Sequence, residues 1–177
     1  MELVLLYLLM VSMSNLVSDQ GVIASDVSGV GTVRQDLAAV AYSTDKGIFA
    51  YGVEPHTGSG GLYSLSNKVG NNGVIASDVT GVGTPRSELA AASYGVGKGA
   101  IAFGQLGSVT SLKNLVSDAG VIASDTTGVG TARRGVGACG YGIDKGIFAY
   151  GFEDLSISNL MSNTGVIAAD VSGVGSG

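Results

Sequence analysis

The stretch GVIASDVSGVGT, Gly21–Thr32, decides the fold because nearly the same segment occurs four times in 177 residues. The other copies are GVIASDVTGVGT at Gly73–Thr84, GVIASDTTGVGT at Gly120–Thr131 and GVIAADVSGVGSG at Gly165–Gly177. The first glycines of successive copies are 52, 47 and 45 residues apart. A period of this length is typical of propeller blades rather than of helical-pair solenoids. The sequence therefore predicts a repeat protein.

A second anchor shows where the repeats differ in length. Lys46, Lys98 and Lys145 each follow the first glycine of the preceding copy by 25 residues. From lysine to the next copy the distance is 27, 22 and 20 residues, so all length variation falls in one connection. Insertions confined to one place indicate a surface loop between fixed elements.

Each repeat contains four short apolar segments that we interpret as strands. In the first complete repeat they are LAAVAYS (residues 37–43), GIFAYG (47–52), LYSLSNKV (62–69) and GVIASDV (73–79). Apolar runs joined by a glycine-containing turn are typical of hairpins. A helix competes over Thr84–Ala92, which has a capping threonine followed by proline. The same element of the next repeat contains Gly135, Gly137 and Gly140, which would each cost a helix about 1 kcal/mol, so we predict a strand.

The N-terminus matches the last repeat. Without gaps, residues 1–21 align with residues 145–165, which places Leu3–Leu8 on the second strand. The prediction is an all-β, propeller-like domain over residues 1–177, with about four blades of four antiparallel strands and one blade a strand short. The units run approximately over residues 1–32, 33–84, 85–131 and 132–177.

Composition excludes several classes of function. The net charge is −5 and the nine Lys and Arg residues are scattered, which argues against nucleic-acid binding. The apolar run Leu3–Val11 is shorter than the ~20 residues of a membrane span. With one histidine, His56, and one cysteine, Cys139, neither a zinc site nor a histidine-based triad is expected. We expect Cys139 to be a small packed residue, and we expect no catalytic residues, cofactor or metal.

Charged residues recur beside the GVG turn of each repeat. They are Asp26, Asp78, Asp125 and Asp170, together with Arg34, Arg86 and Arg133. Aspartate before glycine is typical of a turn that its side chain stabilises. The alternative is a ligand site on each blade, for calcium or a sugar. The Asp and Arg side chains could also pair between neighbouring blades, where an exposed pair contributes about 0–1 kcal/mol.

The segments PRSELAAASYGVGKGAIAFGQLG (residues 85–107) and TDKGIFAYG…GVIASDV (within residues 44–79) resemble the kelch-like repeats of tail-fibre and appendage proteins from phages and environmental microbes. The resemblance covers nearly the whole chain. It implies an extracellular or virion-attached β-propeller with a structural or adhesive role and no enzymatic activity.

The incomplete blade suggests a function. An unpaired strand edge is a template for association, and strand addition uses its main-chain hydrogen bonds. We therefore expect head-to-tail self-assembly into an extracellular filament, sheath or virion appendage through strand exchange. The assembly residues would be Leu3, Val4, Leu5, Leu6, Tyr7, Leu8, Leu9 and Met10. The alternative is a lectin-like adhesion module that binds surface glycans on its blade faces through residues such as Asp78 and Tyr94.

Overall fold

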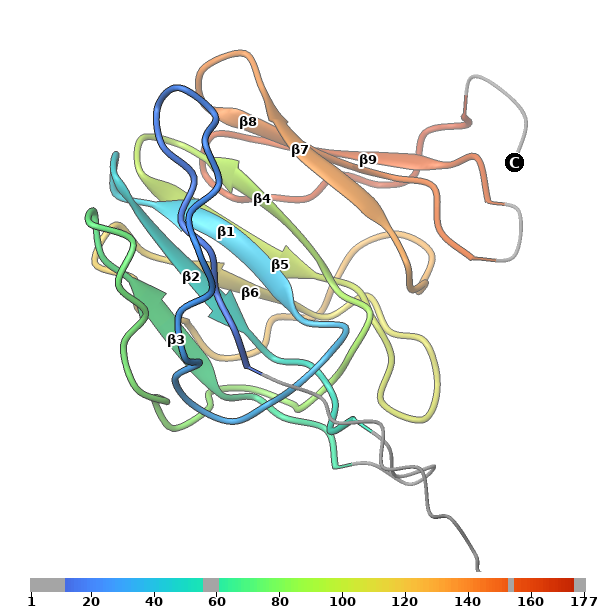
Figure 1. The fold of residues 1–177 in the computed structure, drawn as a ribbon. Coiled ribbons are helices and arrows are strands. Elements are labelled where there is room, and N and C mark those ends of the chain that lie inside the picture. Colours follow the sequence, from blue (N-terminus) through green and yellow to red (C-terminus); the bar gives the residue numbers. More distant parts are fainter. Residues whose placement is uncertain (1–11, 56–60, 153–154, 174–177) are drawn as a thin grey trace, which may run out of the picture.

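The computed structural model describes residues 12–55, 61–152 and 155–173, and these residues form an all-β structure without helices. The strands are β1 (Ala38–Tyr42), β2 (Lys46–Ala50), β3 (Ser66–Val69), β4 (Ala90–Tyr94), β5 (Lys98–Ala102), β6 (Lys113–Val116), β7 (Gly137–Tyr141), β8 (Lys145–Ala149) and β9 (Ser158–Met161). They form three antiparallel sheets in the orders β1-β2-β3, β4-β5-β6 and β7-β8-β9 (Figure 1).

Each sheet is one sequence repeat. We call residues 32–79 unit 1, residues 84–126 unit 2 and residues 131–171 unit 3. The second strand of every unit begins at the anchor lysine, which lies opposite the last tyrosine of the first strand, as Lys46 lies opposite Tyr42. The strand prediction for the alanine-rich segment of residues 84–92 is confirmed by β4. Ala91 packs against the cluster shared with unit 1, and Ala90 and Ala92 belong to the cluster shared with unit 3.

The fourth predicted strand is present in a reduced form. The segment of residues 73–79 pairs with β3 through two isolated antiparallel bridges, Val69 with Ile75 and Ser66 with Val79. The same pair of bridges recurs in units 2 and 3. It also recurs between Val17 and Ile23 and between Ser14 and Val27, so residues 14–27 form an N-terminal hairpin that corresponds to the last two segments of a unit.

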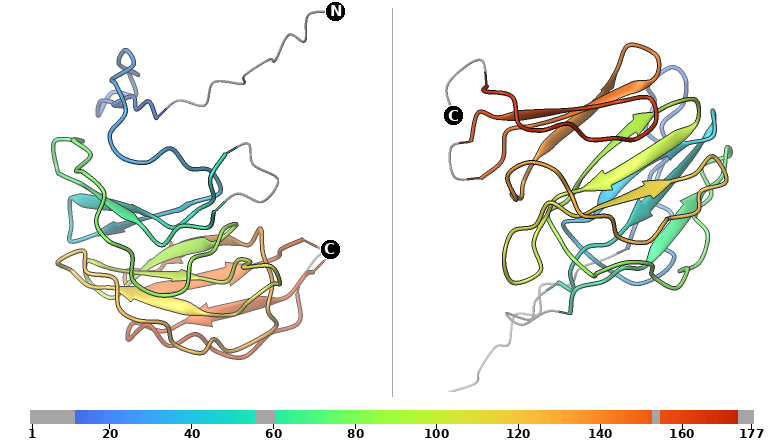
Figure 2. Two further views of the ribbon diagram at one scale, coloured as in Figure 1. Left: turned by 90° about the horizontal axis from the view of Figure 1, so that it is seen from below. Right: turned by 180° about the vertical axis from the view of Figure 1, so that it is seen from behind.

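The prediction of a propeller-like domain with about four four-stranded blades, one of them a strand short, is confirmed as an all-β structure but is wrong in its number of strands and in the closed propeller. The described residues contain nine strands in three sheets, and these sheets do not close into a ring. They follow one another with the N-terminal hairpin at one end and β7–β9 at the other (Figure 2). The fourth segment of each unit forms only two bridges, so it does not extend the sheet as a regular strand. The apolar segment Leu3–Met10 lies outside the described residues.

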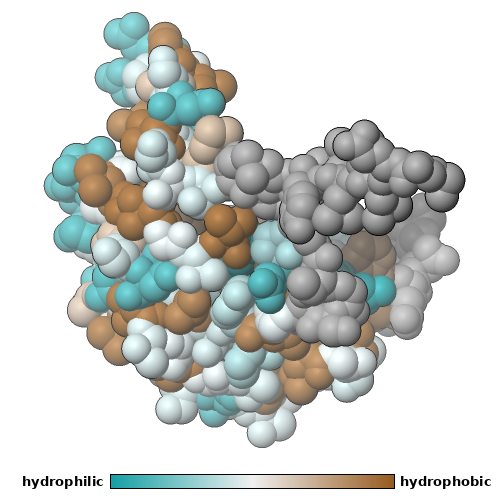
Figure 3. Space-filling model, turned by 60° about the horizontal axis from the view of Figure 1, so that its bottom comes forward, coloured by the Kyte–Doolittle hydropathy of each residue, from teal (hydrophilic) through white to brown (hydrophobic). Residues whose placement is uncertain are grey.

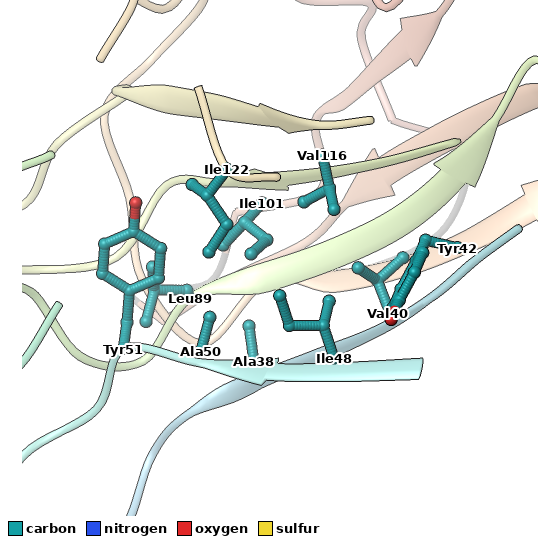
Figure 4. Packing of buried hydrophobic residues seen from close by; sticks show 10 residues of the cluster. All are labelled: Ala38, Val40, Tyr42, Ile48, Ala50, Tyr51, Leu89, Ile101, Val116 and Ile122. Carbon is teal, nitrogen blue, oxygen red and sulfur yellow. The ribbon is translucent and has the colours of Figure 1, made fainter. Parts of the chain in front are cut away.

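The core lies between the units. One cluster joins units 1 and 2 and includes Val40, Tyr42, Ile48, Val116 and Ile122 (Figure 4). A second cluster joins units 2 and 3 in the same way. Small residues let the sheets approach closely: a Cβ at Gly99 of β5 would lie 2.8 Å from the Val40 side chain. This explains why the strands are rich in alanine and glycine.

Backbone hydrogen bonds also join the units. The Glu88 N–H donates to the Asp36 carbonyl at 3.0 Å, and the Gly135 N–H donates to the Glu88 carbonyl at 3.1 Å. All three residues have positive φ angles, of 52°, 54° and 61°. Among the described residues, none lies in a helix that is long and apolar enough to cross a membrane.

Candidate functional site

The recurring arginine is the centre of a buried polar network. In unit 2, Arg86 is fully buried. Its Nη2 donates to Asn114 Oδ1 at 2.6 Å, its Nε donates to the Phe103 carbonyl at 3.0 Å and its Nη1 donates to the Thr84 carbonyl at 3.2 Å. Burial lowers the pKa of the Arg86 guanidinium below its usual value. The arginine fork thus ties the turn, the second strand and the third strand of one unit together.

The recurring aspartate completes this network. Asp125 Oδ2 accepts hydrogen bonds from the Thr84 amide at 2.8 Å and the Thr84 hydroxyl at 2.6 Å, and its Oδ1 accepts one from Asn114 Nδ2 at 2.9 Å. The Arg86 guanidinium lies 3.6 Å from the same carboxylate. Burial by itself would raise the pKa of Asp125, but these hydrogen bonds and the Arg86 charge lower it below its usual value.

The same arrangement occurs in the other two units, except that Nε of Arg34 in unit 1 is buried without a hydrogen-bond partner. Unit 1 uses Thr32, Arg34, Asn67 and Asp78, and unit 3 uses Thr131, Arg133, Asn159 and Asp170. The second glycine of each GVG turn is required by this packing. At Gly83, where φ is 81°, a Cβ would overlap Oδ1 of Asp125. The GVGT-x-R motif therefore forms the turn and supplies the threonine and the arginine of the network.

The expected pairing of the recurring Asp and Arg between neighbouring blades is wrong, because these side chains pair within a unit: Arg34 with Asp78, Arg86 with Asp125, and Arg133 with Asp170. The segment that follows the GVG turn carries the arginine and the fourth segment carries the aspartate, and both segments belong to one unit. What the arginine does contribute between units is a cation–π contact. Arg86 covers the ring of Tyr51 in unit 1.

The N-terminal hairpin has only half of this network. Asn15 Nδ2 donates to Asp26 Oδ1 at 2.8 Å and to the Ala24 carbonyl at 3.0 Å, as in the complete units. All four arginines of the chain belong to the described residues, and none of them contacts Asp26. The Asp26 carboxylate thus lacks the Thr-x-Arg segment whose threonine and arginine bind the equivalent carboxylates of the complete units.

Sequence reasoning missed the asparagines of the network. Asn15, Asn67, Asn114 and Asn159 precede the recurring aspartate by 11 residues in all four copies. They stand in the similar segments SNLV, SNKV, KNLV and SNLM, at residues 14–17, 66–69, 113–116 and 158–161. The constant spacing is the signal that could have found them.

The exposed faces at the two ends differ from the faces between units. Tyr51 and Phe103 are 0% and 1% exposed beneath Arg86 and Arg133, whereas the equivalent Tyr150 is 51% exposed. Cys139 is exposed too, contrary to the expectation of a packed residue, because in the described part of the chain no unit packs on this face of β7. At the other end, the projecting N-terminal hairpin carries exposed hydrophobic residues (Figure 3).

No chemically reactive constellation is evident in the described part of the chain. These residues include no group of three or more His, Cys, Asp or Glu side chains that could hold a metal ion. The recurring aspartates direct their carboxylate oxygens at threonine and asparagine donors of their own unit. The distinctive features are therefore the repeated Thr–Arg–Asn–Asp network and the two exposed ends.

In comparisons with known proteins, no family model matches the chain and no curated protein is significantly similar to it.

Proposed function

We propose that the chain is a non-enzymatic structural repeat protein that assembles end to end into a filament, sheath or appendage, outside the cell or on a virion. The observation that carries this proposal is the exposure of Tyr150, whose counterparts Tyr51 and Phe103 are buried by the next unit. Apolar surface that is buried at every internal interface but open at the end of the array favours association. The location rests on the kelch-like resemblance of the sequence.

The apolar segment Leu3–Met10 has a place in this proposal. In sequence it corresponds to the second strand of a unit and directly precedes the N-terminal hairpin. A strand from this segment would add main-chain hydrogen bonds to the end of the array. It would also enlarge the apolar surface that the N-terminal end offers to another copy.

The lectin-like alternative has less support. Both carboxylate oxygens of Asp78 already accept hydrogen bonds, from Thr32 and Asn67. Tyr94 is buried between units 2 and 3. Neither residue is free to bind a sugar, so the alternative would rely on the exposed tyrosines of unit 3.

The test is electron microscopy and sedimentation velocity of the full chain over a series of concentrations. We expect regular polymers whose length grows with concentration, and polymers that form only at higher concentration after deletion of residues 1–11. This deletion spares Ser14, which pairs with Val27 in the hairpin. The control deletes residues 56–60, within the connection that is shorter in the other repeats, and should polymerise normally. A full chain that stays monomeric at all concentrations would overturn the proposal.

A further inference from the structure

We propose that the N-terminal hairpin of one copy binds the exposed face of unit 3 in a second copy, with Val17 and Ile23 packed against Tyr141. This inference rests on the proposed end-to-end assembly and specifies its contact. The equivalent interface occurs twice inside the chain, so the shape of both partners is known.

The internal interface pairs a tyrosine of one unit with a bridge of the next. Between units 1 and 2, Tyr42 shares a cluster with Val116 and Ile122, which form the bridge between β6 and the fourth segment (Figure 4). Between units 2 and 3, Tyr94 shares a cluster with Met161 and Ile167. The two interfaces use equivalent positions, which defines a general rule for stacking units.

The N-terminal hairpin presents the same bridge without a partner. Val17 and Ile23 are 65% and 69% exposed, whereas Val116 and Ile122 are 0% and 7% exposed. The hairpin is therefore an uncovered copy of a surface that the chain buries elsewhere.

Unit 3 presents the tyrosine without a partner. Tyr141 is 39% exposed, whereas Tyr42 and Tyr94 are 4% and 5% exposed. Cys139 beside it is exposed, although the equivalent Val40 and Ala92 are buried. The two halves of one interface thus lie open at opposite ends of the same chain.

A glycine provides the seat for the tyrosine ring. A Cβ at Gly120 would lie 2.6 Å from the Tyr42 ring, and a Cβ at Gly165 would lie 2.9 Å from the Tyr94 ring. The equivalent Gly21 of the hairpin has the same left-handed backbone, with φ of 76°, but nothing within 4 Å of its Cβ position. The space beside Gly21 is therefore open, and the Tyr141 ring of a second copy would occupy it.

The contact does not require the hairpin to leave its own chain. Leu16 of the hairpin packs on Gly73 of unit 1, so one side of the hairpin is used within the chain, while Val17, Gly21 and Ile23 remain open. Because the two partner surfaces are different, each added copy offers a new open end. Such a heterologous contact produces open polymers when its rotation does not close a ring.

Two single variants and their mixture test the contact. Ile23→Glu damages only the hairpin, and Tyr141→Glu damages only the face of unit 3. Both side chains are exposed, so circular dichroism should show folded proteins. Each variant alone should be monomeric, because one half of every contact is damaged. In an equimolar mixture, the intact face of the Ile23→Glu chain binds the intact hairpin of the Tyr141→Glu chain, and growth stops at a complex of twice the chain mass.

The control is Val96→Glu, at a site that is 76% exposed in the turn between β4 and β5, and it should polymerise like the unaltered chain. If the unaltered chain polymerises and both variants do so as well, this contact is wrong although the proposed function stands. If both variants are monomeric and their mixture also stays monomeric, the pairing of these two surfaces is wrong. If the unaltered chain never assembles, the proposed function itself fails.

Discussion

The guanidinium of Arg86 lies 4.6 Å from the centroid of the Tyr51 ring, so the arginine that locks unit 2 also covers an aromatic side chain of unit 1. The relationship recurs between Arg133 and Phe103, at 4.1 Å. One side chain therefore serves two purposes, since it satisfies the polar groups of its own turn and packs between sheets.

Replacing Arg86 with methionine should destabilise the protein by about 3 kcal/mol or more, because the change leaves Asn114 and Asp125 without their buried cationic partner. Chemical denaturation followed by circular dichroism measures the loss. The matched control is Arg134→Met. Arg134 is partly exposed and pairs with Glu88 at 2.8 Å, so its loss should cost about 1 kcal/mol or less. Equal effects of the two substitutions would contradict the role of the network.

Replacing Gly83 with alanine should destabilise the protein more than replacing Gly107 with alanine. Both glycines have positive φ angles, of 81° and 98°, so both variants carry the backbone penalty of about 1–2 kcal/mol. Only at Gly83 does the new Cβ overlap the carboxylate of Asp125, whereas Gly107 has nothing within 4 Å. Melting temperatures of the two variants provide the comparison, and similar values would show that the turn can shift without cost.

Much of the fold could be predicted because the same pattern of strands and turns occurs in three complete repeats. The anchor lysines mark the starts of β2, β5 and β8, and the alanine and glycine content of the first strands indicates close stacking. The repeat could not reveal how completely each strand forms. The fourth segment directs its aspartate into the network and makes only two bridges with the third strand.

The site was harder to predict than the fold. Thr84 and Asp125 are 41 residues apart, and they meet only when the GVG turn is folded against the third strand. Asp and Arg were recognised as recurrent, but recurrence does not show whether a pair lies within a unit or between units. The sequence could not show which tyrosine is exposed, since Tyr42, Tyr94 and Tyr141 occupy identical positions in the repeat and differ only in what covers them.

The aspartates of the network should make the protein sensitive to acid. Their folded-state pKa values are lowered, as for Asp125, where burial opposes the shift but hydrogen bonds from Thr84 and Asn114 outweigh it. A lowered pKa contributes stability that is fully present above the unfolded value of about 3.9 and is lost as the pH falls through the folded value. We therefore expect the melting temperature to fall below about pH 4.

Asp125→Asn tests this origin. The variant should be less stable than the unaltered protein at pH 7, and its melting temperature should depend less steeply on pH below about 4. Asp118→Asn is the control at an exposed position, and it should keep the acid dependence of the unaltered protein. An unchanged pH profile for Asp125→Asn would show that other carboxyl groups dominate acid unfolding.

Tyr51 should make the protein sensitive to alkali. Its hydroxyl donates to the Val82 carbonyl at 2.9 Å, and burial raises its pKa to about 12, although the nearby Arg86 charge opposes this shift. A raised pKa contributes stability that is fully present below the unfolded value of about 10 and is lost as the pH rises through the folded value.

Tyr51→Phe removes the ionisable group but keeps a ring under Arg86, as Phe103 does under Arg133. The variant should therefore unfold at a higher pH in titrations followed by circular dichroism between pH 9 and 12.5. Tyr150→Phe, at the exposed equivalent position, should leave the midpoint unchanged. If both substitutions shift the midpoint equally, ionisation of the buried Tyr51 is not what limits stability in alkali.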